Sequence, residues 1–113
     1  VAGFSFGALL CMQLLMRRPE ITRFISVSPQ PNLYDFNFLA PCPASGLIVQ
    51  GKKDEMVAPE ETARLAEKLK SQKNITVDYE EISGANHFYD NEQDRLEKVV
   101  RKYIERELNS KYR

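Results

Sequence analysis

The stretch V-A-G-F-S-F-G at residues 1–7 decides the fold, because it joins two kinds of local structure through one serine. The residues before Ser5 have the composition of a strand end, and the apolar run that follows, at about 6–18, has the density of a buried helix. A strand that passes directly into a helix must turn sharply, and side chains would collide in such a turn. Glycines two positions before and two positions after the serine, Gly3 and Gly7, leave room for it. The stretch predicts a tight turn that presents the Ser5 hydroxyl above a sheet.

Outward from this turn, the hydrophobic pattern predicts alternating strands and helices. Strands are expected at residues 21–28, 45–50 and 75–82, and helices at about 6–18, 59–72 and 91–108. The first helix is apolar on nearly every side, which predicts that it is buried all round. The last strand alternates polar and apolar residues, as a half-exposed strand near a sheet edge does. This order predicts an α/β fold with a mostly parallel sheet and helices on both faces.

Composition limits the class of protein. The chain of 113 residues is at most one domain, and its 16 basic residues balance 16 acidic ones, so no nucleic-acid partner is expected. Cys11 and Cys42 form no disulfide framework and favour a reducing, cytoplasmic compartment. The longest apolar stretch, at 8–16, is far below the roughly 20 residues that span a bilayer, so no membrane association is expected. A single histidine excludes a multi-histidine metal site.

Two further polar residues follow predicted strands. Asp54 lies in the loop after strand 45–50, and His87 lies in the loop after strand 75–82. The carboxyl ends of parallel strands meet at one edge of a sheet, where open α/β sheets place their ligand sites. We therefore expect Ser5, Asp54 and His87 to lie together, in the chain order Ser, Asp, His.

Three segments carry a resemblance to a known family: G-F-S-F-G at 3–7, G-K-K-D-E-M-V at 51–57 and G-A-N-H-F at 84–88. In this order the chain resembles the C-terminal half of an α/β-hydrolase, and it is similar to small cap-less bacterial hydrolases of the dienelactone-hydrolase-like group. Dienelactone hydrolase has a cysteine nucleophile where this chain has Ser5, so that substrate is not implied. The resemblance implies that residues 1–113 are one partial α/β-hydrolase domain, which starts at the nucleophile turn and lacks the N-terminal strands.

The resemblance also implies a role for each residue. Ser5 would attack an acyl carbonyl, His87 would act as general base and then general acid, and Asp54 would orient His87. The backbone N–H of Phe6 would be one oxyanion-hole donor, and the second donor would come from a loop outside this chain. The implied substrate is a small molecule with a carboxylic ester or related acyl bond, hydrolysed without a cofactor or metal. Candidate pocket residues follow strands at the same edge: Phe4, Ser28 and Tyr34.

Several alternatives stay open at the level of the residues. Ser5 is also a favoured helix N-cap, and Asp35 is a second candidate for the acid. Residues 46–53 are one position short of a phosphate-binding P-loop, because Lys53 stands where a Ser or Thr would bind magnesium. A non-catalytic interaction module that keeps the three residues is the main alternative to an enzyme. The exposed sheet edge expected without the N-terminal strands predicts self-association or pairing with a complementing N-terminal segment.

Overall fold

Four parallel strands form one sheet in the computed structural model, which describes residues 1–39 and 41–111. The strands are β1 (Ala2–Phe4), β2 (Arg23–Val27), β3 (Ser45–Gly51) and β4 (Val77–Ile82), in that order across the sheet. The helices are α1 (Phe6–Arg17), α2 (Pro59–Lys70) and α3 (Gln93–Lys111), with a short 3-10 turn, η1, at Asn37–Leu39. None of the helices in these ranges is long and apolar enough to cross a membrane. The predicted α/β fold with a parallel sheet is confirmed.

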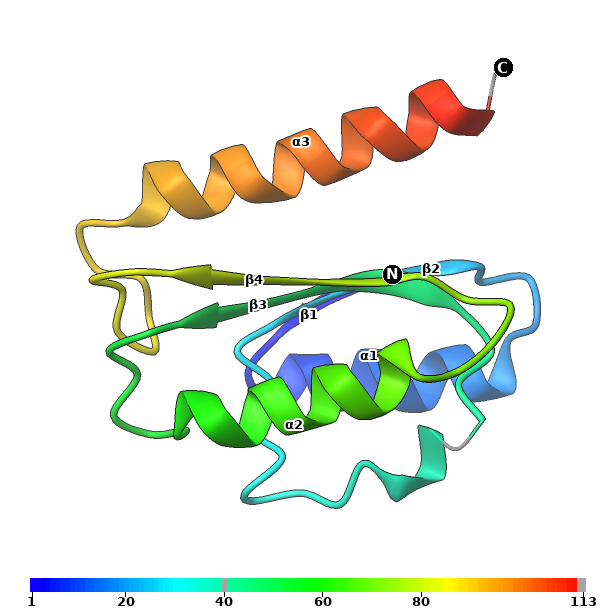
Figure 1. The fold of residues 1–113 in the computed structure, drawn as a ribbon, viewed down its shortest axis with the longest axis horizontal. Coiled ribbons are helices and arrows are strands. Elements are labelled where there is room, and N and C mark those ends of the chain that lie inside the picture. Colours follow the sequence, from blue (N-terminus) through cyan, green and yellow to red (C-terminus); the bar gives the residue numbers. More distant parts are fainter. Residues whose placement is uncertain (40, 112–113) are drawn as a thin grey trace.

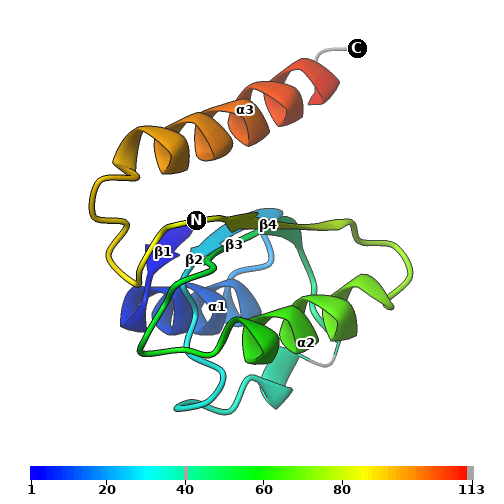
Figure 2. The same cartoon turned by 60° about the vertical axis from the view of Figure 1, so that its left-hand side comes forward.

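The helices cover both faces of the sheet. α1 and α2 lie against one face and α3 lies across the other (Figure 1), and the turned view in Figure 2 shows the same layers. Successive residues of β3 alternate between the two layers: Ile48 belongs to the core that includes Leu65 of α2, whereas Leu47 and Val49 belong to the core that includes Tyr103 of α3. The central strand is therefore buried on both faces, as its short apolar run predicts.

The outer side of α1 is exposed, which its sequence pattern does not predict. The buried residues of α1 are Ala8, Leu9, Met12 and Leu15. Leu10 and Leu14 instead keep 49% and 42% of their surface exposed. The prediction of a helix buried all round is wrong for the described part of the chain, because only one side of α1 packs on the sheet.

The two outer strands differ in their surroundings. β4 lies at one end of the sheet, as predicted, with Val77 and Ile82 buried and Glu80 and Glu81 exposed. β1 lies at the other end and pairs with β2 through residues 2–4. Within residues 1–39 and 41–111, β2 is the only strand that pairs with β1. The outer backbone groups of β1 therefore form an edge of the sheet that can pair with a further strand.

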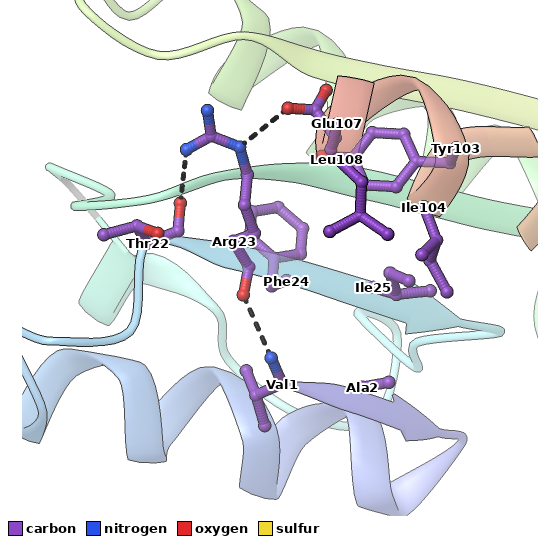
Figure 3. Close-up of a pocket in the computed structure, with 10 residues that line it drawn as sticks. All are labelled: Val1, Ala2, Thr22, Arg23, Phe24, Ile25, Tyr103, Ile104, Glu107 and Leu108. Atoms are coloured by element: carbon purple, nitrogen blue, oxygen red, sulfur yellow. Dashed lines mark hydrogen bonds and ion pairs between the residues drawn. The ribbon is translucent and has the colours of Figure 1, made fainter. Parts of the chain in front are cut away.

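A groove of about 780 Å³ opens where the amino ends of β1 and β2 approach the last turns of α3 (Figure 3). Its lining is mainly apolar and includes Ile25, Ile104 and Leu108. The charged side chains in the groove pair with each other, because Arg23 Nε donates to Glu107 Oε2 at 3.0 Å. The groove lies at the amino ends of the strands, and thus at the opposite edge of the sheet from the loops that follow them.

Candidate active site

Ser5 occupies a strained turn between β1 and α1. Its φ is 57° and its ψ is −119°, a left-handed backbone conformation that costs a residue other than glycine about 1–3 kcal/mol. The Ser5 N–H donates to the Val27 carbonyl of the neighbouring strand at 2.8 Å, and the Ala8 N–H donates to the Ser5 carbonyl at 3.0 Å. The Ser5 side chain makes no hydrogen bond to the helix N-terminus. The interpretation of this residue as a side-chain N-cap is therefore wrong.

The turn requires glycine at position 3. A Cβ on Gly3 would lie 2.3 Å from the Gly7 carbonyl oxygen and 2.7 Å from Cys11 Sγ, well inside van der Waals contact. A Cβ on Gly7 would meet nothing within 4 Å beyond its immediate neighbours. The glycine before the serine thus allows β1 to pack closely on α1, whereas the glycine after it leaves open space beside the turn.

We expect Gly3→Ala to destabilise the fold by about 1–3 kcal/mol or more, because the new methyl group would meet the backbone of α1. Gly7→Ala is the matched control, since it adds the same methyl group to open space and gains helix propensity worth about 1 kcal/mol. Urea unfolding followed by circular dichroism measures both variants. Equal unfolding midpoints for the two would contradict the steric argument.

Three side chains from three loops form a continuous hydrogen-bonded chain. His87 Nε2 lies 2.9 Å from Ser5 Oγ, and His87 Nδ1 lies 2.7 Å from Asp54 Oδ2. Ser5 follows β1, Asp54 follows β3 and His87 follows β4, so the parallel sheet brings all three to its carboxyl edge. The His87 and Asp54 side chains are 3% and 0% exposed, which shields their interaction from the screening that bulk water provides.

The hydrogen bonds define which nitrogen of His87 carries a proton. An ionised Asp54 carboxylate only accepts, so the neutral imidazole donates to it from Nδ1. Nε2 then carries a lone pair and accepts the hydrogen bond from Ser5 Oγ. This arrangement can take the Ser5 proton while the serine oxygen attacks an electrophile.

Asp54 is held by donors on both of its carboxylate oxygens. Oδ1 accepts the backbone N–H groups of Met56 and Val57, each at 2.8 Å. Oδ2 accepts from Gln50 Nε2 at 2.9 Å in addition to His87. Sequence reasoning missed Gln50, although a polar residue at the end of a buried apolar run is a signal that could have identified it.

A second buried group braces the loop that carries His87. Ser28 Oγ donates to the Tyr89 hydroxyl at 3.0 Å, and that hydroxyl donates to the Val49 carbonyl at 3.3 Å. Burial raises the pKa of Tyr89 to about 12, so the hydroxyl stays protonated and remains a donor. Ser28 is 0% exposed. The prediction that Ser28 lines a substrate pocket is wrong, because its hydroxyl faces Tyr89 in the interior.

Exposed aromatic rings border the turn between β1 and α1. Phe4 is 41% exposed, and its ring centroid lies 5.5 Å from that of His87 and 6.1 Å from that of Phe88. Phe6 is 50% exposed, and its ring centroid lies 5.6 Å from that of Tyr34. Phe6 is also the first residue of α1, where backbone N–H groups have no acceptor within the helix. The turn therefore combines apolar surface with backbone donors.

The structure removes two alternatives. Asp35 is exposed, and its Oδ1 accepts the backbone N–H of Asn37 at 2.8 Å, so it caps a local turn while Asp54 is the partner of His87. Residues 46–51 belong to β3, whereas a P-loop needs them as a loop, so the phosphate-binding interpretation is wrong. In the described ranges, no group of at least three His, Cys, Asp or Glu side chains could hold a metal ion.

Three known proteins are similar to most of this chain. An uncharacterised protein of Rickettsia prowazekii is 44% identical over 108 residues, which cover 92% of this chain and 45% of that protein. A protein of unknown function from Agrobacterium tumefaciens, provisionally classed as an α/β hydrolase, has a TM-score of 0.96 at 52% identity, over 97% of this chain and 50% of its own. An α/β serine hydrolase without lid from Xanthomonas campestris has a TM-score of 0.78 at 26% identity, over 93% of this chain and 45% of its own. The chain thus spans about half the length of these relatives.

A family model covers most of the chain. Residues 20–110 match the model of the prolyl oligopeptidase family. The matched range runs from just before β2 almost to the end of α3, and it includes Asp54 and His87. The solved relatives have the same α/β-hydrolase architecture. The chain belongs to the prolyl oligopeptidase family, within the α/β-hydrolase superfamily.

Proposed function

We propose that this chain supplies the nucleophile, the base and the acid of a serine hydrolase that cleaves a carboxylic ester or a related acyl bond. The observation that carries the proposal is the chain of contacts from Ser5 Oγ through both ring nitrogens of His87 to Asp54 Oδ2, at 2.9 and 2.7 Å. A hydroxyl, an imidazole and a carboxylate in this sequence are the groups that nucleophilic acyl transfer uses. Membership in the α/β-hydrolase superfamily supports the same chemistry.

In the proposed reaction, Ser5 Oγ bonds to the acyl carbonyl carbon while His87 Nε2 takes the hydroxyl proton. The proton on Nδ1 stays in place, and Asp54 stabilises the resulting imidazolium. The backbone N–H of Phe6 donates to the carbonyl oxygen as negative charge develops on it. His87 then returns the proton to the leaving group as the bond to the acyl carbon breaks. A water molecule repeats the sequence, which releases the acid and regenerates Ser5.

The proposed substrate is a small molecule with an apolar group next to the scissile bond. Phe4, Phe6 and Phe88 keep 41%, 50% and 58% of their surface exposed, and Tyr34 packs against Phe6. Exposed rings of this kind bind apolar groups well. The likeness to dienelactone-hydrolase-like enzymes stays a prediction. Because the family is named for peptide bonds, an amide is included among the related acyl bonds.

We propose that an additional polypeptide segment, of the kind that the longer relatives of this chain contain, completes the site. A second oxyanion donor normally faces the first from a loop after another strand, and loss of one donor costs about 10²–10³ in rate. A strand that pairs with the outer edge of β1 would bring such a loop to the Ser5 turn. The same edge of β1 and the exposed side of α1 would also suit a non-catalytic module that binds another protein segment. A measurement of hydrolytic activity therefore decides between the enzyme and the non-catalytic module.

We propose a reducing, cytoplasmic compartment for the protein. Cys11 and Cys42 are both free thiols. Cys11 Sγ donates to the Ala2 carbonyl at 2.9 Å, and burial raises the pKa of the Cys42 thiol. Cys42 is buried and Cys11 is half-buried, and neither thiol is cross-linked, which is typical of proteins in reducing compartments.

Labelling with a fluorophosphonate probe tests the proposed function. We expect the folded chain to be labelled at Ser5, as located by mass spectrometry of its peptides, and we expect urea denaturation to abolish labelling. Hydrolysis of p-nitrophenyl esters and p-nitroanilides then distinguishes ester from amide substrates. Slow turnover by this chain, together with faster turnover by a longer protein that contains it, would support the proposal that an additional segment completes the site. A folded chain that is unlabelled, or labelled at another serine, would overturn the proposal and favour the non-catalytic module.

A further inference from the structure

A buried polar pair lies directly behind the carboxylate of Asp54. Gln50 ends the apolar run of β3, and Thr62 lies in the first turn of α2. Both residues are 0% exposed. Thr62 lies on the buried side of α2 together with Leu65 and Leu69. Apolar residues usually occupy the buried side of an amphipathic helix. Burying an amide and a hydroxyl in such positions is unfavourable unless each finds hydrogen-bond partners.

The partners of Gln50 fix the orientation of its amide group. Nε2 donates to Asp54 Oδ2 at 2.9 Å and to the Gly51 carbonyl at 3.1 Å. Oε1 accepts from Thr62 Oγ1 at 2.8 Å. A flipped amide would turn Oε1 toward two groups that only accept, the ionised carboxylate and the carbonyl. Gln50 therefore presents its amide N–H to Asp54, and Thr62 satisfies the acceptor on the other side.

The amide of Gln50 donates to the same oxygen of Asp54 that accepts the hydrogen bond from His87. Oδ1 is occupied by the backbone N–H groups of Met56 and Val57, which restrict rotation of the carboxylate. Oδ2 receives the His87 Nδ1–H on one side and Gln50 Nε2 on the other. Without the amide, Oδ2 would keep a single donor in a place that water does not reach.

We propose that Gln50, held by Thr62, is a positioning residue that directs Oδ2 of Asp54 toward the Nδ1–H of His87. The consequence is a fixed tautomer: the ring proton stays on Nδ1, and Nε2 keeps the lone pair that faces Ser5. This role rests on the proposed serine-hydrolase function, because the tautomer matters for taking the Ser5 proton. Neither Gln50 nor Thr62 touches the reacting atoms.

Two isosteric substitutions and two controls test the role. Gln50→Met keeps the length of the side chain and removes the amide, and Thr62→Val keeps its shape and removes the hydroxyl. Thr62→Ser restores the hydroxyl. Ile48→Val is the matched packing control, because Ile48 lies on the same strand and face as Gln50 and is equally buried.

The first readout is nitrogen NMR of the imidazole, which is unambiguous because His87 is the only histidine of the chain. The second is the rate of fluorophosphonate labelling at Ser5. We expect Gln50→Met and Thr62→Val to shift part of the His87 population to the Nε2–H tautomer and to slow labelling about tenfold. Thr62→Ser and Ile48→Val are expected to keep the wild-type tautomer and labelling rate.

The outcomes separate this inference from the proposed function. A pure Nδ1–H tautomer in folded Gln50→Met and Thr62→Val would overturn the positioning role, as would an equal tautomer shift in Ile48→Val. If Gln50→Met fails to fold, the His87 tautomer and the labelling rate are compared between Thr62→Val and Thr62→Ser. That comparison alone then tests the positioning role. A wild-type chain that is never labelled at Ser5 counts against the proposed function, while the tautomer readout still tests the hydrogen bonds of Gln50.

Discussion

Ser5→Ala, in a longer protein that contains this chain, is expected to lower ester hydrolysis by about 10⁶-fold and to abolish fluorophosphonate labelling. Alanine has no oxygen to attack the carbonyl carbon, so no covalent intermediate forms and His87 has no hydroxyl proton to take. The fold is expected to survive, because the substitution removes one hydrogen bond, worth about 1 kcal/mol, and keeps a residue other than glycine in the left-handed turn. The measurement is kcat/KM on a p-nitrophenyl ester, with labelling scored in parallel.

Ser71→Ala is a suitable control for this prediction. Ser71 is an exposed residue at the end of α2, where its hydroxyl donates to the Lys68 carbonyl at 2.7 Å. Its replacement also removes one hydroxyl and one hydrogen bond, but it leaves the carboxyl edge of the sheet unchanged. We expect wild-type turnover from it. Equal activity of Ser5→Ala and Ser71→Ala would show that the nucleophile lies elsewhere.

Asp54→Asn, in the same longer protein, is expected to lower kcat by about 10⁴-fold through a reversal of hydrogen-bond direction. The backbone N–H groups of Met56 and Val57 face one side of the group and require the amide oxygen there. The new NH₂ would then face His87 Nδ1 and Gln50 Nε2, which are donors in the wild type. The imidazole is expected to respond by moving its proton to Nε2, where it can no longer accept the proton of the serine.

Asp35→Asn is the matched control for the charge change. Asp35 is the other acidic residue that the sequence offered, and its exposed side chain caps a local turn. We expect this variant to keep full turnover and the Nδ1–H tautomer of His87, whereas Asp54→Asn loses both. The reverse result, with Asp35→Asn inactive and Asp54→Asn active, would exchange the assignments of the two residues.

Much of the fold and of the candidate site could be predicted because it depends on local sequence and on element order. Pro59 begins α2 as predicted, and the apolar run before Asp54 forms the central part of β3. Once the strands are parallel, the loops after them meet at one edge whatever side chains fill the core. The closeness of Ser5 and His87, which are 82 positions apart, follows from that topology.

Buried polar pairs between elements could not be predicted in the same way. Gln50 and Thr62 meet because α2 packs over β3, and Ser28 reaches Tyr89 across 61 positions of sequence. Such contacts depend on the side-chain rotamers of two elements and leave no periodic signal in either. The exposed side of α1 is a related case, because an apolar pattern reports a preference for burial without identifying the surface that covers it.

The long connection between β2 and β3 has an evolutionary consequence. Beyond Ser28, its residues 29–44 carry none of the three hydrogen-bonded groups, which lie in the other connections of the sheet. It does carry Tyr34, whose ring rests against Phe6 beside the serine turn. Surface loops tolerate substitution and insertion better than the elements they join. Under the proposed function, natural selection could therefore change which molecules bind beside the serine turn by altering this segment, while Ser5, Asp54 and His87 stay unchanged.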